Sequence, residues 1–178
     1  MRARLSAIIS GITSKDVDPI KWSDILLYDS NAEKMEKYAL EGAHIAQNLK
    51  EAALAADCII LCVKPQNFAQ VLPELSSVDG IAQTLIISIA AGISTDSIEP
   101  SVKGAPIVRV MPNTPMLIGQ GVSALCRTQN VSDEDFDFAC GIFASAGKII
   151  KISEGEMNKI ICATGSSPAY VFMVIKAY

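Results

Sequence analysis

The sequence has little of what several common classes of protein require. It contains one histidine, His44, which excludes metal sites built from several histidine ligands. Its 15 basic residues are outnumbered by 19 acidic ones, so it lacks the basic surplus of a general nucleic-acid-binding protein. None of its apolar runs approaches the roughly 18 residues that a membrane-spanning helix needs, and no membrane partner is expected.

Cysteine is present, but in a pattern that excludes two of its usual structural roles. The five cysteines are scattered through apolar segments without Cys-x-x-Cys spacing: Cys58, Cys62, Cys126, Cys140 and Cys162. An odd, dispersed set argues against a disulfide framework and against a zinc site. We expect buried free thiols, no bound metal, and a protein of the reducing cytoplasm.

What the sequence does have is apolar content sufficient for a large core. Half of its 178 residues are hydrophobic, 19% are charged, and the mean hydropathy is +0.33. This composition excludes a disordered chain. The length suits one domain and the beginning of a second.

Short apolar segments alternate with segments of helical periodicity. Strands are expected at 24–29, 43–46, 58–63, 84–90, 107–111, 121–127 and 148–152, and helices at 5–12, 32–41, 49–56, 68–75 and 133–146. This order is typical of an α/β protein with a doubly wound, mostly parallel sheet. Residues 58–63 are apolar at every position, which predicts a central strand.

In such sheets the ligand lies beyond the carboxyl ends of the strands, and these ends carry the candidate functional residues. Asp29 suits an acceptor for the adenosine ribose hydroxyls of a dinucleotide, and Ser30 and Asn31 could instead donate to a 2′-phosphate. Alternatively, all three simply cap the helix that begins at Ala32. The run Ala90–Gly92 suits either close approach of a flat ring or helix–sheet packing. Lys64 either lies near a phosphate or is solvated, and we favour solvation. Asn113 and Thr114 form a polar tip stiffened by prolines on both sides.

Other chemistries have weaker support. There is no Gly-x-Ser-x-Gly elbow to pair with His44 in a Ser-His-Asp triad. Residues 165–168, Gly-Ser-Ser-Pro, fit the ordinary capping of a helix that begins at Pro168. The acidic cluster 133–135 is better explained as the solvated N-terminus of a helix.

Several strings taken together identify a family. The residues at 108–115 (Val-Arg-Val-Met-Pro-Asn-Thr-Pro) and 165–172 (Gly-Ser-Ser-Pro-Ala-Tyr-Val-Phe), with 63–65 and 88–94 in the same order, resemble pyrroline-5-carboxylate reductase. The resemblance implies a Rossmann-like fold and NAD(P)H-dependent reduction of L-1-pyrroline-5-carboxylate to L-proline in proline biosynthesis. It also implies a soluble enzyme that is a homo-oligomer at full length.

The same resemblance implies which residues contact the cofactor. They are Ser30, Asn48, Cys62, Val63, Lys64, Pro65, Ile89, Ala90 and Ala91. Asn48 is the nearest asparagine to the family's position, where Leu49 is in register. Ser30 suits the 2′-phosphate of NADPH while Asp29 would repel it, so NADPH is expected over NADH with the choice left open. No residue is identified as the proton donor.

Two departures from the family lead to further expectations. The chain lacks a first strand with its Gly-x-Gly-x-x turn, and it stops within an apolar helix where the family continues into a helical dimerisation domain. We therefore expect a cofactor domain at 1–153, incomplete at its first strand, and the start of the helical domain at 154–178. Weak dinucleotide binding, negligible turnover, exposed apolar surface and self-association should follow.

Two alternatives to this function remain. One is a non-catalytic dinucleotide-binding or regulatory module that kept the sheet and lost the chemistry. The other is a reductase with a related cofactor domain that acts on a hydroxy acid or a different imine.

Overall fold

A computed structural model of the chain describes residues 2–13, 20–160 and 173–176. Its α-helices are α1 (Arg2–Thr13), α2 (Glu36–Leu40), α3 (Leu49–Leu54), α4 (Phe68–Ser76), α5 (Thr95–Ile98), α6 (Asp133–Ala144) and α7 (Glu154–Ile160). Its strands are β1 (Leu26–Leu27), β2 (His44–Ile45), β3 (Cys58–Leu61), β4 (Leu85–Ser88), β5 (Ile107–Pro112), β6 (Gly121–Arg127) and β7 (Gly147–Lys151). The helix expected from Pro168 begins outside these residues.

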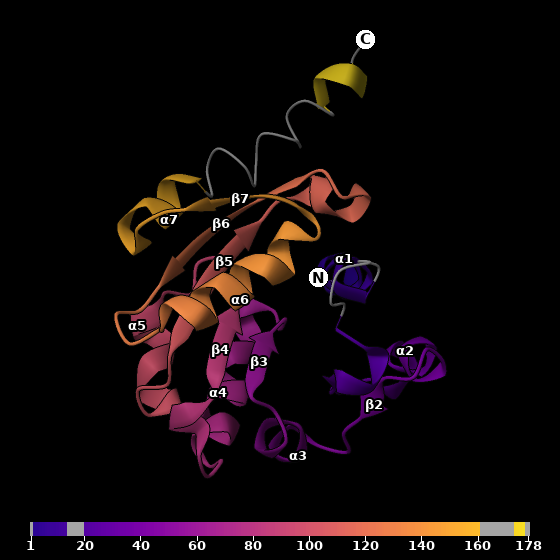
Figure 1. Ribbon diagram of the computed structural model, residues 1–178, viewed down its shortest axis with the longest axis vertical. Coiled ribbons are helices and arrows are strands. Elements are labelled where there is room, and N and C mark those ends of the chain that lie inside the picture. Colours follow the sequence, from indigo (N-terminus) through magenta and orange to yellow (C-terminus); the bar gives the residue numbers. More distant parts are fainter. Residues whose placement is uncertain (1, 14–19, 161–172, 177–178) are drawn as a thin grey trace.

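The strands form two sheets. The larger has the order β3-β4-β5-β6-β7, with only β5 and β6 antiparallel. The smaller is the parallel pair β1-β2, which lies to the side of β3 below α1 (Figure 1). The expected α/β class with a mostly parallel sheet is confirmed.

The position predicted for residues 58–63 is wrong. Among the described strands β3 pairs only with β4, so it lies at an edge of its sheet rather than at the centre. Both faces of this strand are nevertheless covered: Cys58 and Ile60 pack against one core cluster, and Ile59 against the other. The apolar pattern reports which faces are buried, and it carries no information about which edges are paired.

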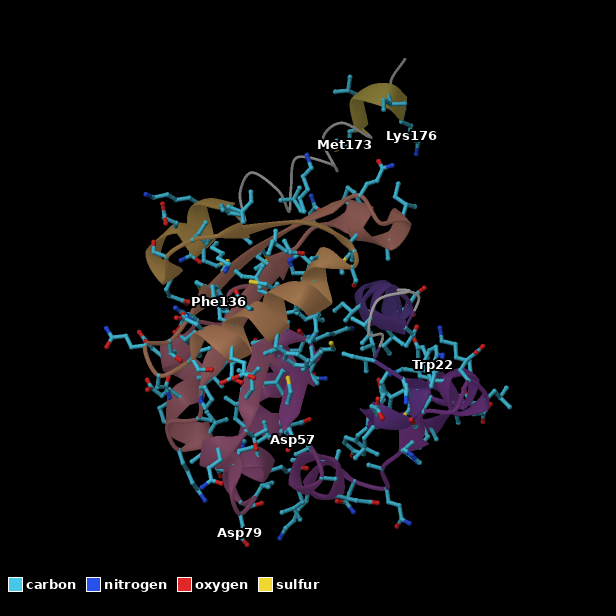
Figure 2. The ribbon with its side chains drawn as sticks, in the orientation of Figure 1. Trp22, Asp57, Asp79, Phe136, Met173 and Lys176 are labelled. Atoms are coloured by element: carbon cyan, nitrogen blue, oxygen red, sulfur yellow. The ribbon has the colours of Figure 1, made fainter. Side chains whose placement is uncertain are left out.

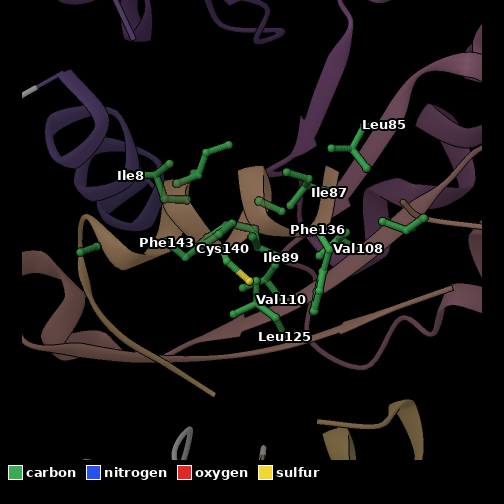
Figure 3. Packing of buried hydrophobic residues seen from close by; sticks show 14 of the residues in the cluster. Ile8, Leu85, Ile87, Ile89, Val108, Val110, Leu125, Phe136, Cys140 and Phe143 are labelled. Carbon is green, nitrogen blue, oxygen red and sulfur yellow. The ribbon is translucent and has the colours of Figure 1, made fainter. Parts of the chain in front are cut away.

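Helices cover both faces of the larger sheet. On one face α6 and α1 pack over the main core cluster, in which Ile8 of α1 lies beside Phe143 of α6 (Figure 3). On the other face α3, α4 and α5 pack over Ile86 and Ile107. Met157 of α7 is fully buried on that face, against Met111. The five-stranded sheet is therefore a rigid base for the loops at its ends.

The smaller sheet is joined to this base through α1. Ile9 contributes to a cluster with Tyr38 and Ala43, while Ile8, its neighbour, belongs to the main core. The Tyr38 hydroxyl also lies 2.7 Å from the Ser6 hydroxyl. Helix α1 thus connects the two sheets, because Ile8 packs into the core of the larger sheet and Ile9 packs against the smaller one.

Some apolar side chains remain exposed, as expected. Leu40, Ile118 and Met173 are each more than two-thirds exposed. Self-association stays a prediction, and so does the division of the chain at 153/154. Within the described ranges no helix is long and apolar enough to cross a membrane.

One ion pair fixes α7 against the sheet. The side chain of Arg109, on β5, is 3% exposed and its Nη1 donates to Glu154 Oε1 at the start of α7. The other carboxylate oxygen of Glu154 accepts from the Cys126 thiol of β6 at 2.9 Å, and Oε1 also accepts from the Thr95 amide at 3.4 Å. Four elements therefore meet at one carboxylate.

Two glycines provide a matched test of the β6–β7 junction. Gly147 has φ +144°, and a Cβ there would lie 2.1 Å from the Gly121 carbonyl oxygen, whereas a Cβ at Gly141 on α6 would meet nothing within 4 Å. Gly147→Ala should lower the free energy of unfolding by more than about 2 kcal/mol, from backbone strain and the clash. Gly141→Ala should raise it by about 0.5–1 kcal/mol. Chemical denaturation measures both, and equal effects would contradict this packing.

Because of the Arg109–Glu154 ion pair, we predict that the free energy of unfolding decreases as the pH falls into the acid range. Burial raises the pKa of Glu154, but hydrogen bonds from Cys126 and Arg109 outweigh it and hold the pKa below the ordinary 4.5. The stabilisation is therefore complete above about pH 4.5 and is lost as the pH falls through the lowered pKa. Glu154→Gln should cost about 2 kcal/mol at neutral pH, less than a fully buried pair because a third of Glu154 is exposed.

The control for this prediction is Glu134→Gln, which removes an exposed carboxylate from the first turn of α6. Denaturation curves between pH 3 and pH 7 should show that the loss of unfolding free energy at low pH is smaller in Glu154→Gln and unchanged in Glu134→Gln. If this loss is unchanged in both variants, the ion pair contributes nothing to stability.

Candidate functional site

Three parallel strands bring the segments that follow them to one edge of the sheet. Leu61 of β3 pairs with Ser88 of β4, and Ser88 pairs with Arg109 of β5. Because all three strands run in the same direction, the segments 62–65, 89–92 and 113–114 continue beyond the same edge. The structure thus brings together seven of the nine residues that were predicted to contact the cofactor.

The segment after β3 contributes two half-buried and two exposed positions. Cys62 and Val63 are half-buried and pack against opposite core clusters, while Lys64 and Pro65 are exposed at the start of a 3-10 turn. Burial raises the pKa of Cys62 to about 12, so its thiol stays protonated at neutral pH and is a poor nucleophile. Exposed Lys64 is the positive charge of this segment, and both of its predicted roles, solvation and a place near a phosphate, stay open.

The segment after β4 is made of small residues. Ile89 and Ala90 are buried, and the Ala90 amide donates to the Ser88 hydroxyl at 3.4 Å. Ala91 and Gly92 are exposed, and Gly92 has φ +79° with open space where a Cβ would be. A ligand can therefore approach the backbone here more closely than it could beside larger side chains.

The other two predicted residues lie on the smaller sheet. Ser30 follows β1 and Asn48 follows β2, so both lie beyond the carboxyl edge of the β1-β2 pair. Ser30 is exposed. Asn48 is the N-cap of α3: its Oδ1 accepts from the Glu51 amide at 2.8 Å. The side-chain oxygen of this asparagine is thus already used in capping.

Asp29 is held by its own segment. Its Oδ1 accepts from the Lys34 ammonium at 2.6 Å and from the Asn31 amide at 2.9 Å. The capping interpretation of Asn31 is wrong in detail, because Asn31 precedes a 3-10 turn but makes no side-chain capping bond. Lys34 was not among the predicted residues, because side chains five positions apart across a turn have no regular helical spacing that would reveal the pair.

The tip after β5 is anchored to the next strand. Asn113 is half-buried, and its Oδ1 accepts from the Val122 amide of β6 at 2.9 Å. Its main-chain oxygen accepts from the Met116 amide at 3.3 Å. The sequence predicted a stiff polar tip here, whereas the bond to Val122 depends on the antiparallel return of β6.

Other parts of the described chain offer no rival centre. A hollow of about 240 Å³ is lined by residues that include Asp57, Asp79 and Thr84. It lies at the amino ends of β3 and β4, and Figure 2 shows Asp79 at the lower end of the molecule. No group of three or more potential metal ligands occurs in the part of the chain that the structure describes, and His44 is exposed.

Comparison with known proteins agrees with this architecture. Residues 5–92 match the family described as "NADP oxidoreductase coenzyme F420-dependent". A pyrroline-5-carboxylate reductase of Haemophilus influenzae is 40% identical over 157 residues, covering 86% of this chain and 57% of that protein. One from Corynebacterium melassecola is 33% identical over 178 residues, covering 96% of this chain and 64% of that protein.

Solved structures give the same result. A pyrroline-5-carboxylate reductase from Coxiella burnetii has a TM-score of 0.88 at 30% identity, covering 98% of this chain and 65% of that one. The Plasmodium falciparum pyrroline carboxylate reductase with NADP bound has a TM-score of 0.79 at 28% identity, covering 98% of this chain and 63% of that one. The chain spans between 57% and 65% of the length of these four proteins. Similarity in sequence and in fold together show that the chain belongs to the pyrroline-5-carboxylate reductase family.

Proposed function

We propose that this chain is the dinucleotide-binding part of an enzyme that reduces L-1-pyrroline-5-carboxylate to L-proline. One observation carries the proposal: the segments 62–65 and 89–91 follow neighbouring parallel strands at one edge of the sheet. This is where open α/β sheets bind dinucleotides. The relatives named above are pyrroline-5-carboxylate reductases, which specifies the substrate.

The residues at this edge fit a dinucleotide. Exposed Ala91 and Gly92 leave the backbone accessible to a flat ring and a ribose, and exposed Lys64 supplies a positive charge for phosphate. Ser30, Asn48, Lys64, Pro65 and Ala91 are the surface positions we assign to the cofactor. The remaining four residues are buried or half-buried at the ends of β3 and β4, where they support the exposed positions and set the shape of the site: Cys62, Val63, Ile89 and Ala90.

A bound reduced nicotinamide supplies a hydride from its C4 to the imine carbon, while a proton reaches the imine nitrogen and the C=N bond becomes a C–N single bond. The chain's own contribution is to bind and orient the cofactor. Cys62 takes no part as a base, because burial keeps its thiol protonated. We assign the proton donor to no described side chain.

We further propose that NADPH is preferred over NADH. In an NADH site, a free carboxylate at the position of Asp29 would accept from the ribose hydroxyls. Here Lys34 and the Asn31 amide already donate to this carboxylate, which leaves Ser30 exposed to donate to a 2′-phosphate. Lys34 also offsets the repulsion that Asp29 would exert on that phosphate.

The remaining parts of the proposal follow from family membership. They are a homo-oligomeric enzyme of the cytoplasm with small-molecule partners, a cofactor domain at 1–153 and a second domain beginning at 154. Free thiols at Cys58, Cys62, Cys126 and Cys140 are compatible with a reducing compartment.

Calorimetry and a turnover assay test the main proposal. The 178-residue chain should bind NADPH saturably, and NADPH at 100 times Kd should stabilise it by about 2.7 kcal/mol. Ala91→Trp should abolish binding by filling the exposed position after β4. The control Ala82→Trp, exposed at the amino end of the same strand, should bind normally.

The outcomes separate the candidate functions. The 178-residue chain should bind NADPH with negligible turnover, because it spans only part of the length of its relatives. In the product of the full reading frame that contains this chain, NADPH oxidation that depends on pyrroline-5-carboxylate and yields L-proline supports the reductase, and binding without that turnover favours the non-catalytic dinucleotide-binding module. No binding, or equal binding by both tryptophan variants, contradicts a site at this edge.

Lys34→Gln tests the cofactor preference. Removing the ammonium leaves Asp29 uncompensated, so NADPH affinity should fall about five- to tenfold, as for loss of a charged hydrogen-bonding partner, while NADH affinity should not fall. Lys50→Gln, which removes an exposed cation from α3, is the control and should change neither affinity. Equal losses for both cofactors would rule out the proposed role.

A further inference from the structure

Asn113 lies at the same edge of the sheet as the loop that we assign to the cofactor. Ile86, Ile87 and Ser88 of β4 pair with residues 107, 108 and 109 of β5, and the two strands are parallel. The segments that follow these two strands therefore leave the sheet at the same edge. The asparagine therefore lies at the same edge as the exposed positions 91 and 92, on the neighbouring strand end.

The bond to Val122 fixes the orientation of the Asn113 side chain. The Val122 amide can only donate, so the oxygen of the side-chain amide must face it, at 2.9 Å. The amide nitrogen then points elsewhere with two N–H groups. No hydrogen bond to this nitrogen is found among the described residues, and the side chain is half-buried. The two N–H groups of this nitrogen are therefore available to a ligand at this edge.

The backbone around Asn113 is restrained before any ligand arrives. Pro112 ends β5, and Pro115 lies in the 3-10 helix Thr114–Ile118. The main-chain bond from Met116 to Asn113 and one from Gln120 to Pro115 close this turn. Little conformational freedom remains to be lost on binding, which favours a contact made from this position.

We propose that Asn113 is a binding residue that donates from its side-chain amide nitrogen to the carboxamide oxygen of the bound nicotinamide. This rests on the proposed function, in which the segments beside it hold the cofactor. An uncharged N–H pair matches an uncharged carbonyl acceptor. The contact turns the carboxamide in one direction and so fixes which face of the ring is presented.

The substitution Asn113→Asp tests the contribution of the side-chain N–H groups separately from that of the side-chain oxygen. The substituted carboxylate keeps an oxygen for the Val122 amide, so the thermal unfolding midpoint should be retained, but it replaces the two N–H groups by an acceptor. NADPH affinity should fall about tenfold or more, because the donor to the carboxamide oxygen is exchanged for a repulsive oxygen. Affinity for 2′-phospho-ADP-ribose, which has no nicotinamide, should be unchanged. Calorimetry measures both ligands.

A control and a second measurement complete the experiment. Asn158→Asp makes the same chemical change at an exposed position of α7 and should alter neither affinity. In the unsubstituted chain, the NADP⁺ analogue with a thioamide should bind more weakly than NADP⁺, because sulfur is the poorer acceptor. This comparison remains decisive if Asn113→Asp does not fold.

Each other outcome has a definite meaning. If Asn113→Asp and the thioamide analogue leave dinucleotide affinity unchanged, Asn113 is only an anchor for β6 and the inference is wrong. If Asn113→Asp weakens 2′-phospho-ADP-ribose as much as NADPH, the acceptor does not lie on the nicotinamide and the assignment is overturned. If the unsubstituted chain binds no NADPH, the proposed function fails first.

Discussion

Backbone hydrogen bonds between β3, β4 and β5 hold three parallel strands in one register, and the positions of the segments 62–65, 89–92 and 113–114 follow from it. Leu61, Ser88 and Arg109 lie in one row across these strands. The loops that follow each strand therefore emerge side by side, although they are far apart in sequence. If β4 shifted by one residue, the side chains of Ser88 and Ile87 would exchange faces and the row would be lost.

The antiparallel strand β6 adds a second constraint to this row. It returns beside β5, so that Val122 meets Asn113 and Cys126 meets Arg109. The carboxylate of Glu154 then ties these strands to α5 and α7 through the Arg109 guanidinium, the Cys126 thiol and the Thr95 amide. A charge in the sheet is tolerated because this carboxylate neutralises it, and the same contact holds α7 in place.

Much of this could be predicted from periodicity. The strands at 107–111 and 121–127 and the helix at 133–146 were predicted to within two residues, because burial on known faces imposes regular spacing. Strand 24–29 was less accurate: only Leu26 and Leu27 are paired, and a 3-10 turn takes residues 22–24. The edge position of β3 was not predictable, because an apolar strand is covered on both faces whether or not both edges are paired.

The fold class, the family and the strand ends at which chemistry is expected could all be read from local spacing and from short strings of residues. The roles of the polar side chains at those ends depend instead on how the strands and helices pack. Asp29 pairs with Lys34, Asn48 caps α3, and Asn113 holds Val122 with its oxygen. A hydrogen bond depends on which groups meet within about 3 Å, and for Asn113 and Val122 that meeting is set by the packing of strands rather than by neighbouring residues.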